Sequence, residues 1–295
     1  MNPRISIIII VKNERGIANT IEALRHQQHS VPTEVIVVDA SDPLTLKDIR
    51  ELYPEVSWYQ FEPRVSGKTS IPEQRNEAVR RAKGDIIVFI DATCIPVDGW
   101  LALLTKPILE ENEYISSGPF GATDISSRIH AINDSVAQYV TSSGTGNLAF
   151  AKVVWENING FDEQFLYGSD VDFTWRCIDA GYTIRYISDA SVSHDWGTDK
   201  ENLHRFYKYG KARADLFVKH PRRILGQLLG ETKLLTAYSL WIFLLPLTWW
   251  YPWYPATILI FVIKNIRTNP LKTIGTNLVY TFGFYWRLFT KIFGI

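Results

Sequence analysis

Apolar residues in the first 90 positions follow two periods, one typical of buried strands and one typical of helices. Apolar, mainly β-branched runs, which predict strands buried on both faces, occupy residues 5–11, 35–38 and 86–90. Helical spacing over 17–28 and a charged-faced segment at 73–82 predict two helices. Strands that alternate with helices predict an α/β fold with a parallel, doubly wound sheet, because parallel neighbours need crossover connections.

Two aspartates come directly after predicted strands. Asp39 follows the run 35–38, and Asp91 follows the run 86–90. In sheets of this kind ligands collect at the carboxyl ends of the strands, where a carboxylate can hold a divalent cation or a ribose hydroxyl. A turn or helix cap is the alternative role for either residue taken singly. Two acids in one crevice favour a ligand site.

The charge balance narrows the class of ligand. Lys plus Arg and Asp plus Glu both number 31, so no basic excess indicates a nucleic-acid surface. The two cysteines, Cys94 and Cys177, are too few for a disulfide framework and lack metal-ligand spacing. We expect both to be small buried residues in a reducing compartment. The apolar run at 5–11 is too short for a signal peptide.

The composition changes abruptly near the C-terminus, where residues 234–263 contain no charged side chain. As a helix, 234–251 would reach about 27 Å, close to the ~30 Å hydrocarbon thickness of a bilayer. An aromatic cluster at 249–255, which prolines interrupt, suits the headgroup level. We therefore expect an α/β domain at 1–220 and a membrane-associated helical region at 221–295.

Basic residues flank this apolar region on both sides. They are Arg222, Arg223 and Lys233 before it, and Lys264, Arg267 and Lys272 after it. Positive flanks predict that both ends stay on the cytoplasmic side of the cell membrane. The simplest arrangement is a helical hairpin that crosses the bilayer or dips into it and returns. The alternative is a buried helical pair at an oligomer interface, and the aromatic side chains of the tail make a homo-oligomer a further expectation.

An ordered series of short motifs gives the chain a specific resemblance. The motifs lie at 5–14, 35–39, 74–78, 82–85, 89–91, 144–150, 160–163 and 168–176. In order and spacing this series resembles the GT-A-fold, family 2 glycosyltransferases over roughly residues 4–215. The resemblance implies a Rossmann-like, mostly parallel sheet flanked by helices, and a nucleoside diphosphate sugar of UDP or GDP type as the donor.

The resemblance also implies roles in a donor site. Glu14 and Asp39 would contact the ribose and the base, and Arg75 would help to hold the nucleotide. Asp91 corresponds to the first acid of the family's Asp-x-Asp motif, which contacts the ribose and the metal-bound diphosphate. Arg205, on a later predicted helix, is a further candidate for the diphosphate, with a surface ion pair as its alternative role.

The general base and the metal ligands are assigned in the same way. Asp170 matches the acid of the Glu-Asp motif, the general base, and His194 resembles a late histidine that binds metal and diphosphate. Thr93 replaces the usual second acid of Asp-x-Asp, and Ser169 replaces the usual Glu before the base. A hydroxyl is a weaker metal ligand than a carboxylate, which leaves dependence on Mg²⁺ or Mn²⁺ open. Asp91 and His194 would hold the cation, with water and diphosphate oxygens completing its shell.

These residue types suit sugar transfer with inversion. One carboxylate takes the proton from the attacking acceptor hydroxyl, and positive charge stabilises the departing diphosphate. The tail predicts a lipid-linked or surface-glycan acceptor at the membrane. One alternative is a catalytically degenerate sugar-nucleotide-binding or scaffold protein, which Thr93 and Ser169 suggest. Another is a nucleotidyltransferase, which would release pyrophosphate.

Overall fold

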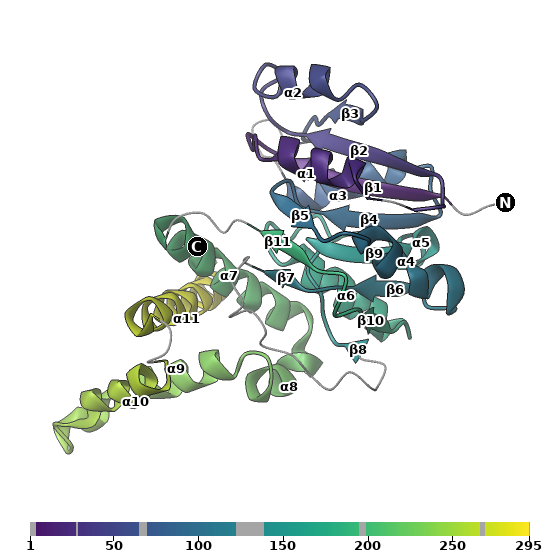
Figure 1. Cartoon of the computed structure of the whole chain (residues 1–295). Helices are drawn as coiled ribbons and strands as arrows, with labels where there is room; N and C mark the ends of the chain where they lie inside the picture. Colours follow the sequence, from purple (N-terminus) through teal and green to yellow (C-terminus); the bar gives the residue numbers. More distant parts are fainter. Residues whose placement is uncertain are drawn as a thin grey trace. The chain divides into compact units, whose positions relative to one another are not determined.

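A computed structural model describes residues 4–27, 29–64, 70–121, 139–194, 199–265 and 269–294 (Figure 1). The chain divides into two compact units, Met1–Asp195 and Trp196–Ile295. The first unit contains the sheets, and the second is helical. Compactness thus places the division at 195/196. The division predicted at 220/221 rested on membrane contact, and it stays a prediction.

An eight-stranded mixed sheet forms the centre of the first unit (Figure 1). In spatial order its strands are β3 (Ser57–Gln60), β2 (Thr33–Asp39), β1 (Ile5–Val11), β4 (Ile86–Ile90), β9 (Asn147–Ala151), β6 (Ile115–Ser117), β10 (Ile184–Tyr186) and β8 (Tyr139–Val140). The first four run parallel, which confirms the predicted α/β arrangement. The sheet is mixed, because β9 is antiparallel to β4 and β6, and β8 is antiparallel to β10.

The direction of β9 matters for the candidate site. Asn147, the first residue of β9, lies opposite Ile90, the last residue of β4. The glycine-rich loop that leads into β9 therefore reaches the same edge of the sheet as Asp91. A parallel strand would have carried this loop to the opposite edge.

Helices cover both faces of the large sheet. On one face pack α1 (Ile17–Arg25), α2 (Lys47–Leu52) and α4 (Trp100–Glu110), and on the other pack α3 (Ile71–Arg81), α5 (Lys152–Asn157) and α6 (Ser169–Asp179). Within β1, Ile7 and Ile9 join the first core and Ile8 joins the second, because successive strand residues point to opposite faces. Cys94 and Cys177 are free and buried, as expected.

A three-stranded sheet brings a late part of the first unit to the loop after β4. Its strands are β5 (Cys94–Pro96), β11 (Val192–His194) and β7 (Phe120–Gly121). β11 runs antiparallel to β5 and places His194 opposite Cys94. Because Cys94 follows Asp91 by three residues, this pairing connects His194 to the predicted donor site.

The second unit consists of helices. They are α7 (Asp199–Lys219), η2 (Pro221–Arg223), α8 (Ile224–Leu229), α9 (Lys233–Phe243), η3 (Leu245–Trp249), η4 (Tyr254–Thr257), α10 (Ile258–Lys264) and α11 (Pro270–Phe293). Glycines let α7 and α11 approach closely. A Cβ on Gly210 would clash with the carbonyl of Tyr280, and one on Gly283 would clash with the carbonyl of Tyr207.

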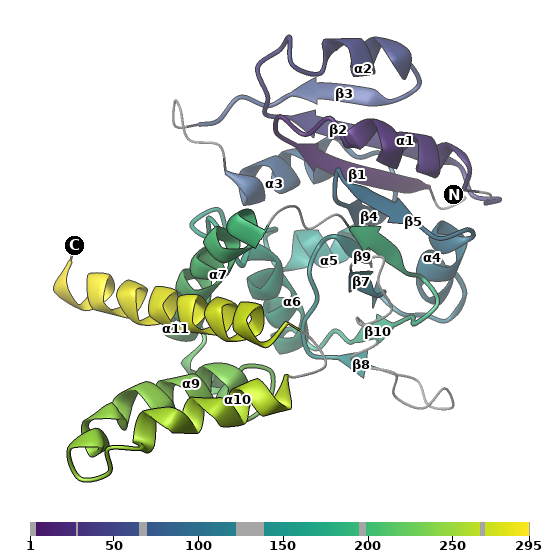
Figure 2. The same ribbon diagram turned by 60° about the vertical axis from the view of Figure 1, so that its left-hand side comes forward.

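Helices α9 and α10 form a hairpin with η3 and η4 at its tip (Figure 2). The two arms meet where the ring of Tyr238 stacks on that of Phe261, with centroids 4.5 Å apart. At the tip, Trp249 is 88% exposed and Trp253 is 85% exposed. The hairpin predicted from the sequence is present.

The length and composition of the helices bear on whether they can cross a membrane. Among the described residues, no single helix is both long and apolar enough to cross a bilayer. The segments Pro221–Leu229 and Lys233–Trp249 reach that length and composition only together, and they are bent by 85° relative to each other. Membrane association and the cytoplasmic location stay predictions, and Arg267 lies outside the described residues.

Candidate active site

Asp91 lies at the centre of a cluster of predicted site residues. It follows β4 directly, and its side chain is partly exposed. Burial raises the pKa of the Asp91 carboxyl above its usual value, the positive charges of Arg75 and His194 lower that pKa, and the negative charge of Asp170 raises it. The charges of three residues that are far apart in the sequence therefore act on the Asp91 carboxyl.

Arg75 supplies a cation from helix α3, which begins after the cap residue Ser70. The Arg75 side chain is only 7% exposed, and its guanidinium lies over the ring of Phe161 at 5.5 Å from the centroid. Its Nη1 donates a 2.8 Å hydrogen bond to the hydroxyl of Ser169. A hydroxyl leaves the positive charge of Arg75 unneutralised, so this charge can act on neighbouring anions.

Asp170 stands in the first turn of α6, which begins after Gly168 in the left-handed region at φ 79°. The amide of Val171 donates a 2.9 Å hydrogen bond to Oδ1 of Asp170. On the other side, a Cβ built on Gly144 would lie 3.5 Å from Oδ2. Because residue 144 is a glycine, the space beside Oδ2 stays open to an incoming hydroxyl.

His194 is held by an aromatic contact. The ring of Phe120 lies 5.0 Å from the imidazole, measured between centroids. A Cβ on Gly146 would clash with the Phe120 ring, so glycine at position 146 is what allows this ring to lie where it does. The glycine-rich loop before β9 therefore contributes to both sides of the cluster, at Asp170 and at His194.

A divalent cation would find two protein ligands here. Asp91 offers a carboxylate and His194 an imidazole, whereas Thr93 offers only a hydroxyl. Within the described ranges, no group of three or more His, Cys, Asp and Glu side chains has metal-binding geometry. Mg²⁺ and Mn²⁺ are commonly bound through one or two protein ligands together with substrate phosphates. The donor set at Asp91 thus fits a cation that arrives with a diphosphate.

Glu14 is exposed in the loop between β1 and α1. Its Oε1 accepts a hydrogen bond of 3.2 Å from the amide of Gly16. A Cβ built on Gly16 would lie 3.0 Å from Cγ2 of Thr93. This close approach puts the loop that carries Glu14 beside the loop after β4. The predicted contact of Glu14 with the ribose and the base stays a prediction.

Asp39 has a different environment. Its side chain is fully buried, and its carboxylate accepts hydrogen bonds from the amide of Ser41 at 2.8 Å and from Nη2 of Arg50 at 3.3 Å. In this conformation the Asp39 carboxylate holds the loop after β2. The predicted contact of Asp39 with the ribose or base stays a prediction.

Arg205 belongs to the second unit, on α7. Its Nη1 donates a 2.9 Å hydrogen bond to Oδ1 of Asn202, one turn earlier on the same helix. Its predicted contact with the diphosphate stays a prediction.

Asn76, next to Arg75, is a structural residue that sequence reasoning assigned no role. Its Nδ2 donates to the carbonyl of Phe161 at 2.8 Å, and its Oδ1 accepts from the amide of Phe161 at 2.8 Å and from Nε1 of Trp155 at 3.0 Å. Asn76 thereby fixes α3 to the segment that supports the Arg75 guanidinium. Asn76 and Phe161 both belong to the motif series, at 74–78 and 160–163, so that series is the sequence signal for this contact.

Comparisons with known proteins agree with this geometry. A model of the family described as glycosyl transferase family 2 matches residues 6–175, more than half of the chain. The chain belongs to glycosyl transferase family 2. Of the cluster, this match includes Arg75, Asp91 and Asp170 and ends before His194.

Two relatives of this family 2 protein are themselves described as glycosyltransferases. A pre-mycofactocin glycosyltransferase from Mycobacterium tuberculosis is 27% identical over 237 residues, which cover 74% of this chain and 48% of that protein. Glycosyltransferase AglE from Haloferax volcanii is 24% identical over 228 residues, which cover 73% of this chain and 75% of AglE. The match thus spans about half the length of the mycobacterial relative.

Solved structures show the same fold. The mannosyltransferase PcManGT from Pyrobaculum calidifontis, determined with GDP-Man and Mn²⁺, superposes with a TM-score of 0.71 at 19% identity, over 99% of this chain and 88% of PcManGT. GalNAc-T7, determined with UDP, GalNAc and Mn²⁺, gives a TM-score of 0.54 at 14% identity, over 72% of this chain and 51% of GalNAc-T7. This likeness confirms the GT-A α/β fold predicted from the sequence.

Proposed function

We propose that this family 2 protein is an inverting glycosyltransferase that moves a sugar from a UDP- or GDP-type donor to a hydroxyl of a lipid-linked or glycan acceptor. The observation that carries the proposal is the convergence of Arg75, Asp91, Asp170 and His194. β11 brings His194 opposite Cys94, three residues after Asp91, and Arg75 donates a hydrogen bond to Ser169, the residue before Asp170. Such a cluster contains both a carboxylate to take a proton and cations to meet a leaving group, which are the two requirements of the reaction.

Asp170 is the general base of the proposal. It stands in the first turn of α6. The Val171 amide occupies Oδ1, so Oδ2 on the side of Gly144 is the oxygen that accepts the acceptor's proton. As the proton moves to Oδ2, the acceptor oxygen attacks the anomeric carbon from the face opposite the diphosphate, and the bond to the diphosphate breaks.

Charge on the departing diphosphate is met from the other side of the cluster. Arg75 contributes a buried guanidinium whose contact with Ser169 leaves it cationic. Asp91 and His194 are the residues that would hold a Mg²⁺ or Mn²⁺ ion, which would supply further positive charge when bound with the donor. The Mn²⁺ reported with PcManGT and GalNAc-T7 supports a divalent cation here.

Membrane contact is the second part of the proposal, with the catalytic unit on the cytoplasmic side. The support comes from the tip of the α9–α10 hairpin, where Trp249 and Trp253 are almost fully exposed. Tryptophan rings favour the headgroup level of a bilayer, and basic residues such as Arg222, Arg223 and Lys233 favour its anionic surface. A membrane-bound chain would meet a lipid-linked or surface-glycan acceptor there. In the competing arrangement, a second copy of the chain covers the exposed tryptophans at the hairpin tip.

A donor panel tests the proposed reaction. The full chain is incubated with UDP- and GDP-sugars and Mg²⁺ or Mn²⁺, with and without a membrane lipid extract, and release of nucleoside diphosphate is measured. Release of UDP or GDP from one donor class, increased by the extract, supports glycosyl transfer. Donor binding with no release would establish a binding-only protein, and pyrophosphate release from a nucleoside triphosphate would establish a nucleotidyltransferase. Either of those results overturns the proposal.

A further inference from the structure

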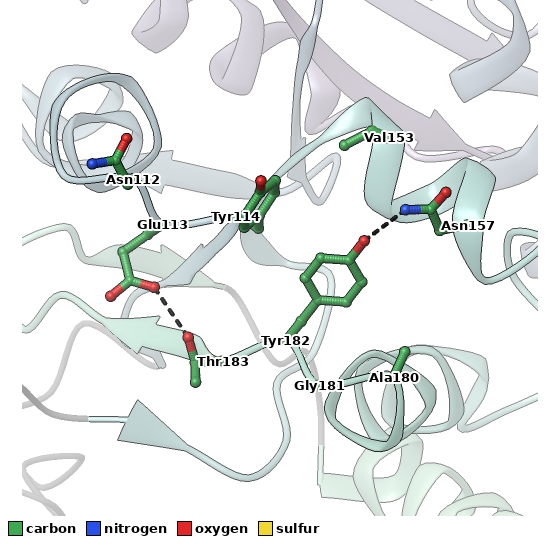
Figure 3. Close-up of a pocket in the computed structure, with 9 residues that line it drawn as sticks. All are labelled: Asn112, Glu113, Tyr114, Val153, Asn157, Ala180, Gly181, Tyr182 and Thr183. Carbon is green, nitrogen blue, oxygen red and sulfur yellow. Dashed lines mark hydrogen bonds between the residues drawn. The ribbon is translucent and has the colours of Figure 1, made fainter.

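A hollow lies in the first unit at the edge of the sheet opposite the candidate active site. It is a pocket of about 410 Å³ (Figure 3). Its lining comprises Asn112, Glu113, Tyr114, Val153, Asn157, Ala180, Gly181, Tyr182 and Thr183. Tyr114 comes just before β6 and Thr183 just before β10, so the pocket opens at the amino ends of these parallel strands. The reacting cluster lies at the carboxyl end of β4, and the proposed reaction leaves this pocket without a role.

Two tyrosine rings form one corner of the pocket (Figure 3). The rings of Tyr114 and Tyr182 lie 5.4 Å apart between centroids, at an interplanar angle of 62°. Tyr114 is 50% exposed, so part of its ring is accessible to a ligand. An exposed ring can pack against the apolar C–H face of a ligand.

Polar groups around this corner are already oriented. Nδ2 of Asn157 donates a 2.7 Å hydrogen bond to the hydroxyl of Tyr182, which leaves the hydroxyl hydrogen of Tyr182 and Oδ1 of Asn157 for a ligand (Figure 3). Glu113 accepts hydrogen bonds from the hydroxyl of Tyr139 at 2.6 Å and from Oγ1 of Thr183 at 3.1 Å. These bonds hold the carboxylate in place, and its remaining lone pairs still accept.

The charge of the lining indicates the class of ligand. Glu113 is its one acidic side chain, and the nine lining residues include no Lys, Arg or His. A phosphorylated or carboxylated ligand would meet a negative charge with no compensating cation. A lone carboxylate is also too few ligands for Ca²⁺, which takes six to eight oxygens. A neutral ligand that both donates and accepts hydrogen bonds, and that has an apolar face, fits best.

We infer that this pocket is a binding site for a neutral saccharide, separate from the site of transfer. Sugar hydroxyls donate to Glu113 and accept from Tyr182, while the C–H face of a pyranose packs on Tyr114. The volume lies within the range of small-molecule sites, roughly 300–1,000 Å³.

Helix α6 connects the pocket to the reaction, on the assumption that the proposed function holds. Asp170 is in its first turn, and Ala180 directly follows its last residue. The 11 residues of α6 span roughly 16 Å at 1.5 Å per residue. A glycan bound in the pocket is therefore held at a fixed distance from the general base, and this suits an acceptor that already carries several sugar residues.

Ligand-observed NMR on the full chain tests the inference. The probes are neutral di- and trisaccharides of glucose, mannose, galactose and N-acetylglucosamine. Each is titrated to about 50 mM, which covers an expected Kd of about 1–10 mM. We expect at least one to bind saturably. Tyr114→Ala should weaken binding about tenfold or more because the ring is lost, whereas Tyr114→Phe should retain it. Tyr182→Phe, which removes the hydroxyl, should weaken binding by several-fold.

Two outcomes would overturn the inference. One is a full chain that releases UDP or GDP from its donor yet binds no saccharide of the panel. The other is saccharide binding that Asp170→Asn abolishes and Tyr114→Ala leaves unchanged, because that pattern places the sugar in the transfer site. Donor hydrolysis without a saccharide should be equal in Tyr114→Ala and the natural chain. Failure of the pocket is thereby distinguishable from failure of the proposed reaction.

Discussion

Nη1 of Arg75 donates a 2.8 Å hydrogen bond to the hydroxyl of Ser169, the residue directly before Asp170. The contact joins α3 to the first residue of α6, so the donor side of the cluster and its base share one buried link. Serine at this position departs from the acid that the family resemblance predicts. The departure leaves Arg75 with a neutral partner and its full positive charge.

The Arg75–Ser169 link predicts that Ser169→Ala impairs catalysis more than donor binding. Loss of the hydroxyl leaves a buried guanidinium hydrogen without its partner, a cost of about 1–3 kcal/mol, and loosens the turn that presents Asp170. We expect kcat to fall roughly tenfold or more, with donor KM changed far less. Steady-state kinetics with the active donor measure both constants.

Ser117 provides the matched control for this variant. It is another buried serine of the first unit, and its hydroxyl has no hydrogen-bond partner among the described residues. Ser117→Ala should leave kcat unchanged and the thermal midpoint equal or higher. Equal kcat losses in the two variants would contradict a specific role for the Arg75–Ser169 contact.

Replacement of Asp91 should stabilise the fold at neutral pH. Burial raises the pKa of Asp91 in the folded chain, so the folded state binds this proton more tightly than the unfolded state does. The stability gained from the protonated form is complete below the unfolded pKa of about 3.9 and is lost as pH rises through the raised folded pKa. Asp91→Asn, which is neutral at every pH, should therefore have the higher thermal midpoint at pH 7 and lose this advantage near pH 4.

Thermal unfolding across pH 4–8 measures this effect. Asp98→Asn, at an exposed position, is the control and should show a small difference that does not follow this pH trend. A lower midpoint for Asp91→Asn at pH 7 than at pH 4, both relative to the natural chain, would contradict a raised pKa for Asp91.

Asp172, two residues from the base, is predicted to be structural. Its side chain is fully buried and forms a 2.8 Å ion pair with Nε of Arg176, whose Nη1 and Nη2 donate to the carbonyls of Ile158 and Gly160. Asp172→Asn leaves this cation partly uncompensated in the interior. We expect a loss of about 3–5 kcal/mol in the free energy of unfolding, measured by urea denaturation. A loss of less than about 1 kcal/mol in the free energy of unfolding would contradict a structural role for Asp172.

The hairpin tip predicts binding to lipid. Trp249→Ser together with Trp253→Ser should reduce flotation of the full chain with vesicles that contain anionic phospholipid, because two interfacial anchors are lost. Leu44→Ser together with Leu52→Ser removes two exposed apolar side chains from the first unit and is the control. Equal flotation of the two double variants would contradict insertion of the tip. Concentration-dependent dimers that persist without vesicles, and disappear in the tryptophan variant, would favour the oligomer instead.

The sequence was most informative where local pattern determines structure. Apolar runs located β1, β2 and β4, and the motif series identified the residues that meet at Asp91. The direction of β9 could not be predicted, because a short buried strand has the same composition in parallel and antiparallel pairing.

Burial of individual side chains was the second limit. Asp39 stands at a strand end, as predicted, yet the Ser41 amide and Arg50 enclose its carboxylate. That enclosure depends on the conformation of the following loop, which no periodic pattern encodes. The pocket at Tyr114 and Tyr182 was also missed, since its lining comes from three separate segments that only the folded chain assembles.

The central claim is that Asp170 takes the proton from the acceptor, and the most direct measurement is the transfer rate of Asp170→Asn beside its donor affinity. The amide keeps the size and the Oδ1 contact of the carboxylate but cannot accept the proton, so transfer should fall by about 10²–10⁴-fold. Donor affinity should stay within roughly threefold, because Arg75 and Asp91 are unchanged. Full transfer activity in Asp170→Asn would contradict the mechanism.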